Sequence, residues 1–388
     1  MWGPVRLWTL LAVAAATPVA AASDRFVPGD PDFVVAVVRQ AQPDEELQRL
    51  LRAWRESSAA TTESVTLAAA FMERARRLRE PAYFGRAEAV LAPLASAPAA
   101  SAVVRRMYAQ VLQYRHDFAA AETLLDGILR DAPHDNDSRL LRASIRLVRG
   151  DFAGARGDCA RLAAEGSHGA QIGFACLAEA LAGGGNLDRA LALLDTAPVQ
   201  YRDVDAAAHA YLLATRAELR ERSRNPDGAI ADYRAALMLS PGEDSIRASL
   251  ADALAARGDT GEALDLLAID KPSLALLVRS AALSDGARRA SLSARAAAWL
   301  ALEAARGDAI HHREEAMLAL VNANPAVALA AALRNFEEQR ELPDVRVLAR
   351  AAHAARDPQA LQTLRRWLRE TGYRDSVTES ILGDGGRS

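Results

Sequence analysis

The stretch VRGDFAGARGDC (148–159) aligns with two earlier stretches of the chain, PAYFGRAEAVL (81–91) and RHDFAAAETLL (115–125). The alignment superposes three phenylalanines, each 34 residues after the last: Phe84, Phe118 and Phe152. Three later stretches follow the same template: GGGNLDRALALL (183–194), NPDGAIADYRAAL (225–237) and RGDTGEALDLL (257–267). Six units result, beginning near Ala68, Ala102, Asn136, Gln171, Ala210 and Asp244. Such a period predicts stacked copies of one small structural unit.

Alanine occupies the eighth and the twentieth place of every unit. The eighth places are Ala75, Ala109, Ala143, Ala178, Ala217 and Ala251, and the twentieth are Ala87, Ala121, Ala155, Ala190, Ala229 and Ala263. Small side chains are needed where two helices cross closely, because a large one would force them apart. The composition agrees, since aromatic residues make up only 5% and most apolar residues are the helix formers Ala and Leu. The sequence therefore predicts antiparallel helix pairs and an all-α fold.

The period, the alanine pattern and the turn glycines Gly150, Gly185 and Gly258 resemble the tetratricopeptide repeat (TPR) family over about residues 68–275. The resemblance implies a superhelical solenoid whose first helices line a concave face suited to partner segments. Where the family commonly has a tryptophan, three units carry Arg105, Arg139 and Arg247, so single units should depend on their neighbours. The C-terminal part also looks like that of exported bacterial repeat proteins.

The pattern predicts five regions along the chain. These are a signal peptide (1–22), an arm with capping helices (23–67), six TPR-like repeats (68–275), degenerate helical repeats (276–372) and a flexible C-terminal tail (373–388).

The first region has the features of a secretory signal. A basic residue, Arg6, precedes an apolar stretch at 7–16, and Pro18 and three small residues at 20–22 follow. The apolar stretch is shorter than the roughly 20 residues that a spanning helix needs. We therefore expect an exported chain, periplasmic or secreted, with no transmembrane segment in its mature form.

A row of acidic residues marks the predicted partner-binding face. The ninth place on the first helices of three successive units is Glu179, Glu218 and Asp252, and these carboxylates should attract a basic or amine-bearing segment. The alternative is that they are ordinary solvated acids. The apolar candidates for the same face are Ile172, Tyr211 and Leu147. The family's carboxylate-clamping members carry Lys, Asn and Arg on these helices, and this chain departs from that pattern.

Cys159 and Cys176 are the only cysteines, and the repeat register places them on neighbouring helices that should pack directly. They are either two buried thiols or a disulfide, and the sequence leaves both open.

Other polar motifs have structural explanations. His311, His312, Glu314 and Glu315 resemble metal ligands, but without a further ligand nearby they predict a solvated charged face. The loop 134–137 lacks the spacing of a calcium site, so Asp135 or Asp137 should cap the next helix, and the glycines 183–185 should form a repeat turn. No cofactor or metal site is predicted. No catalytic motif is present either, although triads assemble in space.

The sequence thus favours a non-catalytic interaction scaffold or adaptor in the cell envelope, which binds a protein or peptide partner. The alternatives are an envelope assembly factor or peripheral subunit and, third, an enzyme with an unrecognised site. With 47 basic and 50 acidic residues, the chain has no field that would attract nucleic acid.

Overall fold

The computed structural model describes residues 44–58, 60–78, 80, 82–164, 170–196, 205–306 and 311–383. The predicted signal peptide and the arm that follows it lie outside the described residues. Residues 1–45 and 46–388 are separate units, and every contact discussed below lies within the second.

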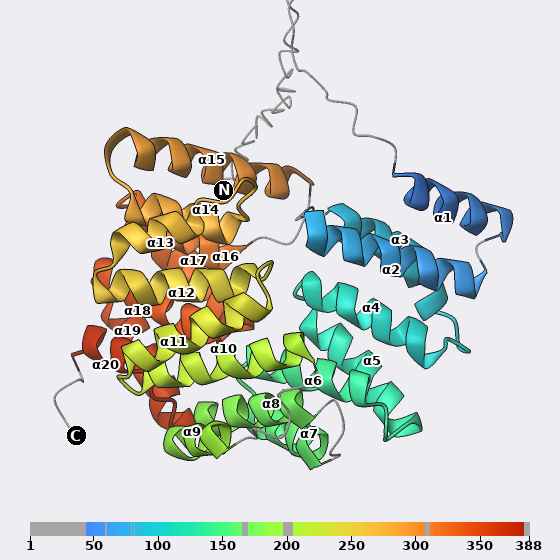
Figure 1. Cartoon of the computed structure of the whole chain (residues 1–388), viewed down its shortest axis with the longest axis horizontal. Coiled ribbons are helices and arrows are strands. Elements are labelled where there is room, and N and C mark those ends of the chain that lie inside the picture. The colour runs from blue at the N-terminus through green and yellow to red at the C-terminus, as the bar shows by residue number, and fades with distance from the viewer. Residues whose placement is uncertain are drawn as a thin grey trace, which may run out of the picture. The chain divides into compact units, whose positions relative to one another are not determined.

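The described residues form twenty helices and no strand (Figure 1). The first thirteen are α1 (Glu45–Glu56), α2 (Thr61–Leu78), α3 (Ala82–Ala95), α4 (Ala102–Tyr114), α5 (Phe118–Asp131), α6 (Asn136–Val148), α7 (Phe152–Ala164), α8 (Ala170–Gly183), α9 (Leu187–Thr196), α10 (Ala206–Arg222), α11 (Pro226–Leu239), α12 (Asp244–Arg257) and α13 (Thr260–Leu267). The remaining seven are α14 (Leu274–Leu283), α15 (Gly286–Arg306), α16 (His312–Val321), α17 (Pro325–Glu338), α18 (Leu342–Ala354), α19 (Pro358–Thr371) and α20 (Ser376–Ile381). Successive helices pack as pairs, so the predicted all-α solenoid of antiparallel helix pairs is confirmed.

The repeat alanines lie where the paired helices pack. All twelve are buried, and Ala75 is the most exposed at 4%. Three units have first helices that begin at the expected residues, Ala102, Asn136 and Asp244. The first helices α2 and α10 are longer and begin earlier. Small residues at these positions let neighbouring helices approach closely, which is the physical basis of the repeat.

The turns and helix starts follow from local chemistry. Asp135 caps α6 by accepting a hydrogen bond of 2.9 Å from the backbone N–H of Ser138, so the predicted capping role is confirmed. The predicted turn at 183–185 is confirmed as well, since Gly185 links α8 to α9 with φ +87°.

Two of the arginines that stand where TPR proteins commonly have tryptophan donate hydrogen bonds to backbone carbonyl oxygens. Arg247 donates to the carbonyl oxygens of Pro241 at 2.8 Å and Leu266 at 3.1 Å. Arg139 donates to the carbonyl oxygen of Pro133 in the same way. Each guanidinium therefore bonds to a carbonyl group just beyond the end of the preceding helix.

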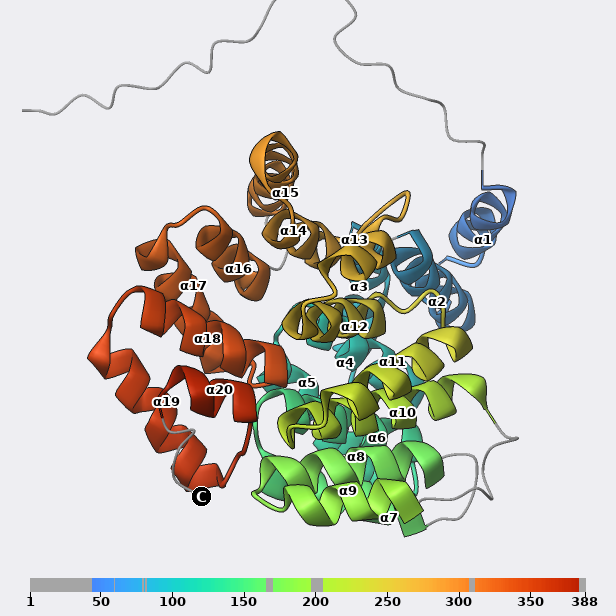
Figure 2. The same ribbon diagram turned by 60° about the vertical axis from the view of Figure 1, so that its left-hand side comes forward.

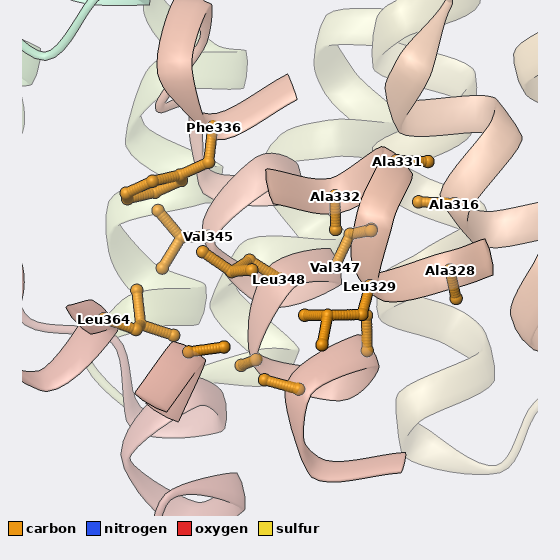
Figure 3. Close-up of a cluster of buried hydrophobic side chains, with 14 of the residues drawn as sticks. Ala316, Ala328, Leu329, Ala331, Ala332, Phe336, Val345, Val347, Leu348 and Leu364 are labelled. Carbon is orange, nitrogen blue, oxygen red and sulfur yellow. The ribbon is translucent and has the colours of Figure 1, made fainter. Parts of the chain in front are cut away.

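Beyond the sixth unit the helix pairs continue. The chain forms the pairs α14 with α15, α16 with α17, and α18 with α19. A core of buried side chains joins the last of them (Figure 3), and its larger members include Leu329, Phe336, Val345, Leu348 and Leu364. Phe152 of α7 belongs to the same core, so the C-terminal pairs and the middle repeats share buried apolar surface.

The predicted flexible tail is wrong for residues 373–383. Tyr373, Asp375, Thr378 and Leu382 are buried, and α20 lies within this segment. Asp375 caps α20 by accepting from the Thr378 N–H at 3.0 Å, and it pairs with Arg346 of α18 at 2.7 Å. A buried charge with a partner holds the segment in place, which its glycine-rich composition did not reveal. Residues 384–388 lie outside the described residues.

The C-terminal segment returns to the middle repeats, and Figure 2 shows α20 at the end of α10. The Arg340 N–H donates to the Val148 carbonyl at 2.7 Å, and Arg222 donates to the Arg374 carbonyl at 2.9 Å. A Cβ added to Gly185 would lie 3.2 Å from the Cα of Gly372, so these two turns approach at a distance that suits glycine. The inner face of the middle repeats is therefore partly covered by the chain's own C-terminal helices.

Candidate partner-binding cavity

Two adjoining chambers lie between the first helices of the repeats and the C-terminal helices. The large chamber has a volume of about 760 Å³ and the small chamber about 510 Å³, both typical of ligand sites. Six residues line both chambers. They are Glu243 just before α12, Asp244 on α12, Ala275 on α14, Arg313 and Glu314 on α16, and Glu341 just before α18. We call the two chambers together the inner cavity.

Glu179 of α8 is the central acid of the small chamber. Its carboxylate accepts hydrogen bonds from the hydroxyls of Thr215 at 3.0 Å and Tyr211 at 3.1 Å, both on α10. Burial, reinforced by the charge of Glu218, raises the pKa of Glu179 to about 8. No ion pair to Glu179 occurs among the described residues. The group is therefore held in place by neutral donors, and much of it is protonated at neutral pH.

Glu218 of α10 is the second acid of this chamber. Burial raises its pKa to about 7; Arg222 opposes this shift, whereas Glu341 and Glu221 add to it. Arg222 is 4.0 Å away and also donates to the carbonyl oxygens of Ala182 and Arg374. Its charge is thus only partly available to Glu218.

The two arginines that line the small chamber are already engaged. Arg279 pairs with Asp252 at 2.9 Å. Arg313 pairs with Asp344 at 2.5 Å and with Glu341 at 2.6 Å. Burial alone would lower the pKa of Arg313, but the charges of Asp344 and Glu341 outweigh burial and hold the pKa well above its usual value. Neither arginine is free to neutralise Glu179.

The large chamber contains a second polar group. Glu303 accepts from the indole N–H of Trp299 at 2.8 Å and lies 3.4 Å from the Nε2 atom of His311. Burial alone would lower the pKa of His311, but the bond to Glu303 and nearby negative charge raise it. His116, also in this wall, has its pKa lowered to about 4 by burial and by the charges of His311 and Arg313. The two histidines therefore differ in charge at mildly acidic pH.

The structure places the predicted site residues in three different settings. Glu179, Glu218 and Tyr211 line the small chamber together. Asp252 is bound to Arg279, which lines that chamber, and so does not extend the row as predicted. Leu147 packs against the C-terminal core. Ile172 is half-buried and lines neither chamber.

The sequence prediction missed the residues that the C-terminal helices contribute. The motif at 311–315 was predicted as a solvated face, which is wrong for Glu314, because it is only 8% exposed and lines both chambers. The sequence predicted degenerate helical repeats over 276–372 without assigning α16 and α17 as the two helices of one pair. Identifying 312–321 as the first helix of that pair would have assigned its charged residues to the inner face.

Cys159 of α7 and Cys176 of α8 form a disulfide, with their Cα atoms 5.4 Å apart. Both are buried, at 0% and 1% exposure, on the facing helices that the repeat register predicted. Of the two alternatives left open by the sequence, the structure has the bonded one.

The described residues contain no group of three or more His, Cys, Asp or Glu side chains arranged to hold a metal. Within the same residues, no helix combines the length and the apolar character needed to cross a membrane.

No protein-family model matches the chain, and no curated protein matches it in sequence. Solved structures with similar folds include a thermophilic TPR protein of Thermus thermophilus, which is 22% identical over 51% of this chain and 98% of that one, with a TM-score of 0.39. A tetratricopeptide repeat protein from Parabacteroides merdae is 12% identical over 78% and 98%, with a TM-score of 0.39. A human IFIT1 dimer with m7Gppp-AAAA is 13% identical over 89% and 86%, with a TM-score of 0.45. The helix pairs of the chain itself, with alanines buried where they pack, have the arrangement that the resemblance to TPR proteins implied.

Proposed function

We propose that the chain is an exported, non-catalytic adaptor that binds a segment of a partner protein in the inner cavity. The observation that carries this proposal is the cavity itself, which lies between first helices of the repeats and the C-terminal pairs. Concave surfaces of stacked helix pairs suit extended segments, and convergent polar groups in a concave site provide specificity.

Two observations support export. The N-terminal residues have the pattern of a secretory signal. Independently, Cys159 and Cys176 are bonded, and structural disulfides persist in oxidising compartments such as the periplasm.

Filling the cavity should abolish partner binding. Ala275 on α14 lines both chambers, so the bulky side chain of Ala275→Trp would occupy the space that the segment needs. Proteins captured from the envelope by the wild-type chain are identified by mass spectrometry, and the affinity of the captured partner is then measured for each variant. We expect a loss of about tenfold or more, corresponding to at least about 1.4 kcal/mol.

The matched control is Ala231→Trp. Ala231 is an exposed alanine on α11 that lines neither chamber. This variant should bind like the wild type. Equal capture of the same partner by the wild type and by Ala275→Trp would contradict the proposal.

A further inference from the structure

Glu314 is an unusual residue for the wall of a cavity. It is 8% exposed, and none of the hydrogen bonds or ion pairs among the described residues involves its carboxylate. It lines both chambers, so its carboxylate is available where the chambers adjoin. The cations nearest to it are bonded to other carboxylates, His311 to Glu303 and Arg313 to Asp344 and Glu341, although the charge of Glu314 still acts on both. A buried polar side chain with no hydrogen bond within the protein is uncommon and calls for an explanation, and a bound ligand is one.

Five further acids line the small chamber with Glu314, and two of them, Glu179 and Glu218, lie on the first helices of the repeats. Glu179 is held only by hydroxyl donors, and the one ion pair of Glu218 is to Arg222 at 4.0 Å. The arginines of the same wall, Arg279 and Arg313, are bound to other carboxylates. Arg76 and Arg77 line only the large chamber. The small chamber therefore has more carboxyl groups than cations available to them, so a bound cation would find acceptors that can ionise.

We infer that the small chamber binds an ammonium group of the partner segment, with Glu179, Glu218 and Glu314 as its carboxylate acceptors. The inference rests on the proposed function, and it names the chemistry that the cavity selects. The three acids come from three helices, α8, α10 and α16. An ammonium group is compact and has three donors that can meet acceptors from separate directions, whereas a guanidinium prefers one planar, bidentate carboxylate. The group can belong to a lysine or to a chain N-terminus.

Proton linkage supports the same assignment. With pKa values of about 8 for Glu179 and about 7 for Glu218, both acids carry protons to a large extent at pH 7. A bound cation favours their ionised forms, so binding should release protons and strengthen as the pH rises from about 6 to about 8. The charged groups facing these acids are Glu221, Arg222, Glu243, Asp244, Arg279, Arg313, Glu314, Glu341 and Arg346.

The test is calorimetric titration of the full chain with three defined peptides. The first, Ac-Ala-Lys-Ala-Lys-Ala-NH2, carries lysine ammonium groups; the second replaces each lysine by uncharged norleucine; the third is penta-alanine amide with a free N-terminus. We expect the norleucine peptide to bind about tenfold or more weakly than the lysine peptide, as for loss of a charge-assisted hydrogen bond. Tight binding of the third peptide as well would identify the N-terminus as a source of the ammonium group.

Three single variants, Glu179→Gln, Glu218→Gln and Glu314→Gln, should each weaken lysine-peptide binding about tenfold while keeping the side chain's shape. Glu337→Gln is the matched control, because Glu337 is exposed on α17 and lines neither chamber. Titration at pH 7 in two buffers of different ionisation enthalpy should show proton release for the wild type. The double variant Glu179→Gln/Glu218→Gln should lose that release.

Equal binding of the lysine and norleucine peptides, with no tighter binding of the peptide that has a free N-terminus, would overturn the inference, and so would no binding of any peptide. Wild-type binding without proton release would overturn it as well. These outcomes are distinct from failure of the proposed function. If all three peptides bind equally and Ala275→Trp blocks all three, the cavity binds a segment but does not select an ammonium group.

Discussion

Replacing Arg346 by leucine should lower the free energy of unfolding by about 3–5 kcal/mol, the range measured when one partner of a buried ion pair is removed. Arg346 of α18 donates to Asp375 at 2.7 Å and 3.1 Å and also pairs with Glu221 of α10. Asp375 is 0% exposed, so the leucine variant leaves a buried carboxylate without its cation. Chemical denaturation followed by circular dichroism measures the change. The same substitution at Arg350, one turn later and exposed, should change stability by about 0.5 kcal/mol or less.

The pH dependence of the same pair gives a second measure. Burial alone would raise the pKa of Asp375, but its bonds to Arg346 and Thr378 outweigh burial and hold the pKa below the usual 3.8. A carboxyl with a lowered pKa contributes stability above its unfolded pKa, and that stability is lost as the pH falls through the lower, folded value. Wild-type stability should therefore fall in this acidic range, and the fall should be smaller in Arg346→Leu. Identical acid profiles would show that the pair does not close the C-terminal segment onto α10.

Removing the disulfide should lower the free energy of unfolding by about 2–4 kcal/mol, since the bond closes a short loop in the unfolded chain. The two cysteines are 17 residues apart, and they connect α7 to α8. The helices pack so closely here that a Cβ added to Gly173 would lie only 2.4 Å from the backbone nitrogen of Ala163. The double variant Cys159→Ala/Cys176→Ala is compared with the wild type by denaturant unfolding.

A reductant provides the control for that comparison. It should destabilise the wild type by a similar amount and leave the double variant unchanged. A wild-type denaturation midpoint that does not move on reduction would contradict a stabilising bond.

The repeats could be predicted from sequence because their information is local and recurs. Small residues at fixed places, such as Ala121 and Ala155, define where helices pack, and each unit repeats the pattern of the last. The two cysteines could be placed on facing helices for the same reason. The register did not decide whether they were bonded, because the same packing accommodates two thiols.

The return of the C-terminal segment could not be predicted in this way. Arg222 contacts the carbonyl of Arg374, 152 residues later, and no period relates these positions. For the same reason, the candidate site could be predicted only in part. Glu179 and Glu218 followed from the repeat register, whereas Glu314 faces them only because the last helix pairs come back against the middle ones. Asp252 occupied the right place in the repeat, but Arg279 of the next pair engages it.

Hydrogen–deuterium exchange of the full chain, with and without the captured partner, tests most directly whether the inner cavity is the binding site. The inner helices α8, α10, α12 and α16 contribute cavity residues, whereas the second helices α9 and α13 contribute none. Bound partner should slow amide exchange in the inner helices and leave exchange in α9 and α13 unchanged. Protection confined to α9 and α13, with unchanged exchange in the inner helices, would contradict the account.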